Sequence, residues 1–258
     1  MLTFTSADIS QWVASFLLPF CRIAAVLMVA PVIGARIVPI RIRAALAVII
    51  TVVVVPHLPA APPVDPLSPA VIGAVGMEVA IGVAIGFALR IAMVAMEFAG
   101  QMISQSMGLG FGALIDPENG TQVPALSQFY MIMTVLIFLA LNAHLVLIEL
   151  MVDSFRGTPP GVPVPVETFG PLIAFGGEIF AAGVLTSLPA VAALLFVNLA
   201  FGVMTRTSPQ FNVFAVGFPV MIVTGLVIVL LTLPVLGGQV ESLLSDAFAV
   251  ARATVRAD

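Results

Sequence analysis

This sequence has few charged residues, and it has no lysine. Only 9% of its 258 residues are charged and all nine basic residues are arginine, whereas a soluble domain carries about 25% charged residues. With 61% apolar residues and a mean hydropathy of +1.21, the chain cannot solvate a globular surface, which excludes a soluble enzyme, a coiled coil and a disordered tail. The net charge of −4 argues against nucleic-acid binding. We expect a protein of a membrane or of a very apolar complex.

Residues for metal or redox chemistry are also scarce. The single cysteine, Cys21, excludes a disulfide framework, a thiol-ligated metal centre and a CxxC redox motif. His57 and His144 lie in different segments and leave little for metal binding or acid–base chemistry. An intramembrane serine hydrolase would need a G-x-S-x-G turn, and the sequence contains none. We therefore expect no enzyme activity, no cofactor and no metal.

Apolar stretches dominate the chain, and about 20 apolar residues suffice to cross a bilayer as a helix. No basic residues and cleavage-like site precede the first stretch, so we expect no cleaved signal peptide. The pattern predicts an all-α membrane protein with about six helical segments. These run approximately over Trp12 to Ala35, Ala44 to Leu58, Ala70 to Met96, Phe129 to Val152, Leu172 to Val203 and Val213 to Leu236.

Prolines interrupt several of these stretches and predict kinked helices, because each removes a backbone donor. They stand at positions 19 and 31 of the first stretch, 189 of the fifth, and 219 and 234 of the sixth. Two proline-rich segments, 56–69 and 157–171, read as extended, semi-rigid connectors outside the membrane.

Arginine placement gives an orientation. Five arginines fall on the side of the loop at Arg206 and three on the other side, so the excess of positive charge on cytoplasmic loops places Arg206 in the cytoplasm and both termini outside.

Charges inside the apolar stretches need partners or water, since each is costly in lipid. They are Arg22, Glu78, Arg90, Glu97, Glu149, Asp153 and Glu178. Arg90 and Glu97 are seven residues apart, share a helix face, and predict charge pairing between subunits. A proton relay is the alternative interpretation. Asp153 and Arg156 are three apart and can pair on one helix.

A glycine-rich apolar run follows the third stretch. Within 97–122, Gly108, Gly110 and Gly112 alternate with apolar side chains that include Met107 and Phe111. Glycine gives the backbone freedom and methionine adapts to irregular shapes, which would suit a deformable seal over a pore. An ordinary re-entrant turn packed against neighbouring helices also fits these residues.

A polar turn follows the fifth stretch. Pro209 disfavours continuation of the incoming helix, so a tight helical hairpin is predicted. Arg206 suits the C-terminus of that helix. Gln210 and Asn212 can satisfy the freed carbonyl groups, either as a simple cap or while binding a neighbouring subunit.

Longer motifs make the chain resemble a known family. The string RTSPQFNVFAVGFP (206–219) follows NLAFG (198–202), and both follow EFAGQMISQSMGLGF (97–111), a DP pair and LNAHL (141–145). In this order the motifs resemble the FliR/SctT family of type III secretion export-gate subunits, and the resemblance covers essentially the whole chain.

The resemblance implies a non-enzymatic subunit in the bacterial inner membrane, assembled with FliP, FliQ, FlhB and FlhA, with unfolded flagellar proteins passing through the central pore. It implies a FliP-like region (1–156) with a plug loop (107–120), a proline-rich linker (157–171) and a FliQ-like hairpin with its tail (172–258). The implied pore plug comprises Met107, Gly108, Gly110, Phe111 and Gly112. The implied partner contact at the hairpin tip comprises Arg206, Pro209, Gln210 and Asn212.

A small-solute secondary transporter or channel is the alternative function. Such proteins usually show inverted repeats and polar residues in broken helices near the bilayer midplane. No pair of matching halves is evident in this sequence.

Overall fold

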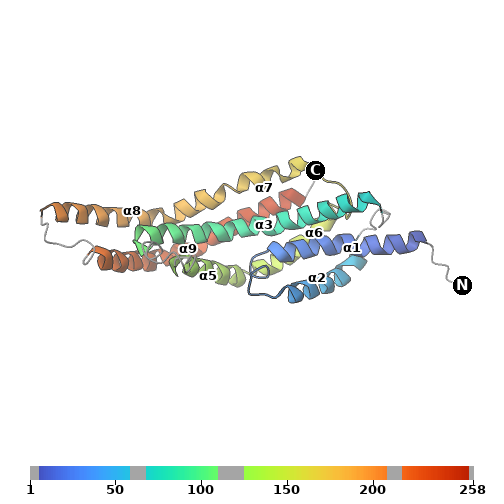
Figure 1. Ribbon diagram of the computed structural model, residues 1–258, viewed down its shortest axis with the longest axis horizontal. Coiled ribbons are helices and arrows are strands. Elements are labelled where there is room, and N and C mark those ends of the chain that lie inside the picture. Colours follow the sequence, from blue (N-terminus) through green and yellow to red (C-terminus); the bar gives the residue numbers. More distant parts are fainter. Residues whose placement is uncertain (1–5, 59–67, 110–124, 208–216, 256–258) are drawn as a thin grey trace. The chain divides into compact units, whose positions relative to one another are not determined.

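Helices make up the regular structure of the described part of the chain (Figure 1). The computed structural model describes residues 6–58, 68–109, 125–207 and 217–255, and no strand occurs in these ranges. The all-α expectation is confirmed. The α-helices are α1 (Ser6–Val29), α2 (Ile40–Val54), α3 (Pro69–Ser106), α5 (Ala125–Ala140), α6 (Ala143–Gly157), α7 (Gly170–Phe175), α8 (Glu178–Thr207) and α9 (Phe218–Val255), with short 3-10 turns η1 (Val55–His57) and η3 (Val166–Phe169).

The predicted membrane character also holds. Five helical stretches in the described ranges are long and apolar enough to cross a membrane, and a sixth is gained if α5 and α6 count as one broken span. The break between α5 and α6 lies at Asn142, whose φ of 56° places it in the left-handed region. The single fourth stretch of the sequence is therefore two helices.

Helix α3 is longer than the apolar pattern predicts. It continues ten residues beyond Met96 to Ser106, through the polar and glycine-containing start of the run that the sequence suggested was a loop. The reason is tertiary: Ala99 and Ile103 are completely buried, so packing outweighs the low helix propensity of glycine and serine.

The prolines fall in three different settings. Pro19, Pro189 and Pro234 lie inside α1, α8 and α9, respectively. Pro31 lies beyond the end of α1, and Pro219 is the second residue of α9, where a missing N–H costs no helical hydrogen bond. These last two prolines therefore bound helices instead of interrupting them.

The helices form two compact units that interleave along the chain. The first comprises Met1–Ile91, Asn142–Gly176 and Leu244–Asp258, and the second comprises Ala92–Leu141 and Gly177–Leu243. Helices α3 and α9 each contribute to both units. The division into FliP-like and FliQ-like regions concerns likeness to other subunits and stays a prediction.

In the first unit, α1 lies beside α2 (Figure 1) and packs closely on α3. A Cβ added at Gly82 would lie 2.7 Å from the Cβ of Ala25, and one at Gly86 would lie 3.0 Å from the backbone nitrogen of Ala30. This GxxxG spacing of small residues lets the two helix backbones approach closely. Around it the core is aliphatic and includes Ile23, Leu27, Ile81, Ile85 and Leu89.

In the second unit, the C-terminal third of α3 packs on α5 and α8. A Cβ at Gly100 of α3 would lie 2.9 Å from the carbonyl oxygen of Leu126. On α8, a Cβ at Gly183 would lie 2.6 Å from the ring of Phe98. That ring also meets Phe180 edge-on, with centroids 5.5 Å apart.

Candidate functional site: the end of α3 and a buried ionic cluster

Helix α3 ends in a turn that contains the first two of the predicted plug residues. The N–H of Met107 donates to the carbonyl of Ile103 at 2.9 Å, and the N–H of Gly108 donates to that of Gln105 at 3.0 Å. Gly108 has a φ of 81°, the left-handed conformation that commonly ends helices and that glycine adopts without strain. Gly108 therefore fixes the point where the chain leaves α3.

The Met107 side chain is held against α9. It is 1% exposed, and a Cβ added at Gly225 would lie 2.5 Å from its Cγ and 2.6 Å from its sulfur. The absence of a side chain at Gly225 thus makes the space that Met107 occupies. Sequence reasoning singled out Met107 but missed Gly225, whose surroundings carry no motif.

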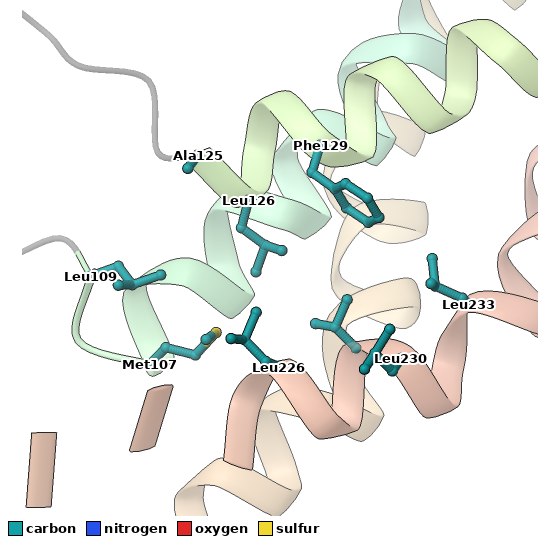
Figure 2. A pocket seen from close by; sticks show the side chains of 9 residues that line it. Met107, Leu109, Ala125, Leu126, Phe129, Leu226, Leu230 and Leu233 are labelled. Atoms are coloured by element: carbon teal, nitrogen blue, oxygen red, sulfur yellow. The ribbon is translucent and has the colours of Figure 1, made fainter. Parts of the chain in front are cut away.

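An apolar pocket of about 400 Å³ adjoins this contact. In Figure 2 the side chains of Met107, Leu126 and Leu226 converge on it from the turn after α3, from α5 and from α9. Every lining residue is apolar, so the pocket offers no hydrogen bond to water or to an ion. The lining residues are Met107, Leu109, Ala125, Leu126, Phe129, Leu226, Val229, Leu230 and Leu233.

Of the other predicted gate and hairpin residues, the structure describes only Arg206. Gly110, Phe111 and Gly112 lie outside the described residues, and so do Pro209, Gln210 and Asn212. Arg206 lies in the last turn of α8, as expected, and is exposed.

Arg90 and Glu97 both lie on α3. Arg90 is exposed and Glu97 is half-buried. Within the described ranges neither side chain has a hydrogen-bond or ion-pair partner. Their pairing with charges of another subunit stays a prediction.

The predicted Asp153–Arg156 pair is present. The Nη1 of Arg156 donates to Oδ1 of Asp153 at 2.9 Å, and both side chains are largely exposed. Exposed pairs of this kind contribute about 0–1 kcal/mol. This pair is a surface contact of α6.

The first unit contains a buried ion pair that the sequence analysis did not predict. The Nε of Arg22 on α1 donates to Oε2 of Glu78 on α3 at 2.7 Å, and both side chains are completely buried. A second bond runs from Nη2 to Oε1 at 3.2 Å. Sequence analysis identified both residues as charges in apolar stretches. Their opposite signs in two predicted spans could have suggested that they pair.

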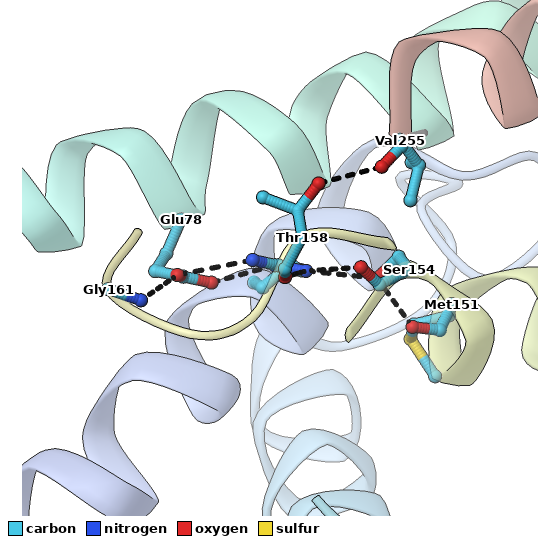
Figure 3. Close-up of polar contacts among 7 residues, drawn as sticks. Glu78, Met151, Ser154, Thr158, Gly161 and Val255 are labelled. Atoms are coloured by element: carbon cyan, nitrogen blue, oxygen red, sulfur yellow. Dashed lines mark hydrogen bonds and ion pairs between the residues drawn. The ribbon is translucent and has the colours of Figure 1, made fainter. Parts of the chain in front are cut away.

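Further partners of Arg22 are Ser154 at the end of α6 and Thr158 at the start of the predicted linker, both labelled in Figure 3. The Nη1 of Arg22 donates to the carbonyl and hydroxyl oxygens of Ser154 at 3.0 and 3.2 Å and to the carbonyl of Thr158 at 2.9 Å. Glu78 accepts the N–H of Gly161 at 2.8 Å. The guanidinium also lies 4.4 Å from the ring centroid of Phe155, within cation–π range.

The same cluster reaches the end of α9. The hydroxyl of Thr158 donates to the carbonyl of Val255 at 2.7 Å. Residues 157–171 are therefore not a free connector along their whole length, since Thr158 and Val164 are buried in the first unit. We call the set Arg22, Glu78, Ser154, Thr158 and Gly161 the ionic cluster.

The ionic cluster links α1, α3, the end of α6 and the start of the linker, which is a structural role. Its two charges pair with each other, and its carbonyl, hydroxyl and amide groups bind within the cluster. Among the described residues, no group of three or more His, Cys, Asp or Glu side chains comes together that could hold a metal ion.

Comparisons with known proteins cover nearly the whole chain. Residues 13–247 match the model of a family described as bacterial export proteins, family 1. The flagellar biosynthetic protein FliR of Pectobacterium carotovorum subsp. carotovorum is 36% identical over 250 residues, which are 96% of this chain and 95% of the relative. FliR of Escherichia coli K12 is 34% identical over 249 residues, with the same coverage. FliR of Bacillus subtilis 168 is 31% identical over 235 residues, or 90% of each chain.

Proposed function

The chain belongs to the bacterial export proteins, family 1, and on this premise we propose that it is a subunit of the flagellar export gate. It is a membrane-embedded component of the export apparatus, as its apolar helices and its FliR relatives indicate. In the proposed role it lines the pore through which unfolded flagellar proteins leave the cell, and it seals that pore at rest. It performs no catalysis.

The observation that carries the sealing role is the apolar end of α3. Met107 is buried against Gly225 beside a pocket with nine apolar lining residues. An ion that entered such surroundings would lose its hydration shell without replacement, and apolar constrictions in channels block ions in this way. Residues 107–120 are the proposed plug, with Met107 and Phe111 as its sealing side chains.

Glycine spacing supports the proposed opening. Gly108 already has a left-handed φ, and Gly110 and Gly112 follow at alternate positions. Three glycines in five residues allow the backbone to reorient when a polypeptide passes. The plug would open by rotation about these bonds, without melting of α3.

The proposed partners are FliP, FliQ, FlhB and FlhA in the bacterial inner membrane. Helices α8 and α9 expose many large apolar side chains, among them Phe196, Leu199 and Leu231, which lipid or sister chains must cover. We assign the partner contacts to the exposed Arg206 with Pro209, Gln210 and Asn212, and intersubunit charge pairing to Arg90 and Glu97. Regions 1–156 and 172–258 are the proposed FliP-like and FliQ-like parts, joined by the linker 157–171.

The sealing role is tested by stiffening or removing the plug. The double variant Gly110→Ala/Gly112→Ala should export less flagellar hook protein at a normal level of assembled complex. Deletion of residues 108–112 should depolarise the cytoplasmic membrane, as measured with a potential-sensitive dye. Normal export by the first variant together with an unchanged potential in the second would refute the plug.

Purification separates this function from small-solute transport. Mild detergent extraction should recover the chain in a large complex with FliP and FliQ. A chain that is stable alone and carries a metabolite would be a transporter. Photo-crosslinkers at Arg206 and Gln210 should capture FlhB or FliQ, and capture of lipid alone would remove the hairpin tip from the interface.

A further inference from the structure

The turn between α1 and α2, residues 30–39, has a fixed backbone. Val32 has a φ of 66°, which is a strained value for a β-branched residue. The N–H of Gly34 donates to the carbonyl of Ala30 at 2.9 Å, and that of Val38 donates to the carbonyl of Ala35 at 3.0 Å. A turn with so many internal bonds keeps its shape and holds its outward side chains in place.

Arg43 stabilises this turn from within. Its Nη2 donates to the carbonyls of Ala35 and Val38, each at 2.7 Å, and its Nε donates to that of Val38 at 3.1 Å. The side chain of Arg43 is therefore committed to the fold of the turn. It is not available for a contact outside the chain.

Two other arginines, one in the turn and one in the first helical turn of α2, make no such internal bonds. Arg36 and Arg41 are exposed, and in the described ranges neither has a hydrogen-bond or ion-pair partner. The sequence contains no aspartate or glutamate between Asp8 and Asp65. The two guanidinium groups therefore have no acidic residue near them along the chain.

Large, exposed aliphatic side chains are the sequence neighbours of these arginines. Ile37 is 89% exposed, Ile40 63% and Ile42 58%. Exposed isoleucine on a rigid turn would order water at a cost in free energy. We call Arg36, Ile37, Ile40, Arg41 and Ile42 the turn surface.

The position of the turn indicates what covers this surface. The stretch Ile40–His57 is an 18-residue candidate span of which only 17% is buried. At 1.5 Å per residue it is about 27 Å long, close to the thickness of a hydrocarbon core. Since α1 is also a candidate span up to Val29, the turn joins two candidate spans, and a bilayer crossed by both would have its boundary between acyl chains and headgroups at this turn.

We propose that the turn surface binds anionic phospholipid. The three isoleucines contact the upper acyl chains, and Arg36 and Arg41 donate hydrogen bonds to the phosphate oxygens of lipids such as phosphatidylglycerol. Guanidinium groups suit this task because their planar fork binds phosphate through two parallel bonds. Charge complementarity favours anionic over zwitterionic lipid, since basic clusters next to a span attract anionic headgroups.

The test places a reporter within the turn surface. A fluorophore is attached at Ile37→Cys in a Cys21→Ser background, and the full chain with its partner subunits is reconstituted in nanodiscs. Quenching by brominated phosphatidylglycerol is compared with quenching by brominated phosphatidylcholine at equal mole fraction. We expect several-fold stronger quenching by the anionic lipid.

Substitution identifies the groups responsible. Arg36→Gln/Arg41→Gln should reduce quenching by phosphatidylglycerol to the level of phosphatidylcholine, whose own quenching should stay unchanged because α2 still spans the disc. Arg156→Gln, which removes an exposed arginine from α6, should keep the preference. Equal quenching by both lipids before substitution, or a preference that survives the double substitution, overturns the proposal.

A crosslinking outcome distinguishes lipid from protein. A photo-crosslinker at Ile37 in intact membranes should label phospholipid. Capture of an acidic segment of a partner subunit, with no quenching by either lipid, would show that the turn surface is a protein interface. Neither result depends on the plug, because export and membrane potential are not measured.

Discussion

Arg22 and Glu78 meet at 2.7 Å with both side chains completely buried. The pair joins α1 to α3, and the remaining donors of Arg22 hold the end of α6 and the start of the linker. Burying two charges costs more than their attraction returns unless every donor and acceptor is satisfied. Here the carbonyls of Ser154 and Thr158, the Ser154 hydroxyl and the amide of Gly161 bind the two charged groups, so the pair depends on the rest of the ionic cluster.

Glu78→Gln should destabilise the protein strongly. It leaves the buried guanidinium of Arg22 without a counter-charge, and loss of one partner of a buried pair costs about 3–5 kcal/mol. Asp153→Asn, which breaks the exposed pair, should cost at most about 1 kcal/mol. Protease resistance of the chain in membranes and its thermal midpoint in detergent measure both. Equal effects of the two variants would mean that the ionic cluster does not hold the first unit together.

Gly82→Ala should separate α1 from α3. The new methyl group would lie 2.7 Å from the Cβ of Ala25 and closer still to the carbonyl oxygen of Arg22, and such overpacking costs about 1–3 kcal/mol. Gly76→Ala is the matched control, because nothing lies within 4 Å of its added Cβ and alanine favours helix by about 0.5–1 kcal/mol. The thermal midpoint should fall for the first variant and hold or rise for the second. The reverse order would contradict the packing of α1 on α3.

Gly225→Ala should displace Met107. Its Cβ would stand 2.5 Å from the Cγ of Met107, so the methionine must leave its place beside the apolar pocket. In the proposed function this loosens the seal and raises ion leakage through the assembled complex. Gly237→Ala on the same helix, with nothing within 4 Å, should have no effect.

Met107→Ala provides the second control for that contact. Removing the long side chain makes room for the added methyl, so Gly225→Ala in the Met107→Ala background should cost less stability than it does alone. Double-mutant analysis of the thermal midpoint measures the difference. Strictly additive effects would show that the two residues do not interact.

Gly108→Ala should strain the turn after α3. At a φ of 81° an L-residue pays about 1–2 kcal/mol, whereas asparagine tolerates the left-handed region better. Export should therefore fall in the order glycine, asparagine, alanine, as measured by hook protein in the medium at equal levels of assembled complex. Equal export by the alanine and asparagine variants would mean that this φ is not required in the working gate.

Local patterns predicted the fold class and the local contacts. Apolar runs of span length indicated the helices, and the three-residue spacing predicted the pair of Asp153 with Arg156. Each signal depends on residues within a few helical turns. None requires knowledge of how distant helices pack.

Long-range partners could not be read in the same way. Glu78 follows Arg22 by 56 residues and Ser154 follows it by 132, and the choice among buried charges depends on helix packing. Gly225 likewise stands in a stretch with no motif, and its importance arises only where Met107 meets it. The helical start of the glycine-rich run was missed for the same reason, since burial of Ala99 and Ile103 decides it.

The members of the ionic cluster are synthesised at widely separated times. Ribosomes add about 5–20 residues per second, and Thr158 follows Arg22 by 136 residues, so roughly 7–27 s pass between their syntheses. Val255, which accepts the Thr158 hydroxyl, follows Thr158 by a further 97 residues. During translation the guanidinium of Arg22 first gains its carboxylate and only later its carbonyl partners. The guanidinium of Arg22 thus lacks part of its hydrogen-bond partners until the end of α6 and Thr158 have been made.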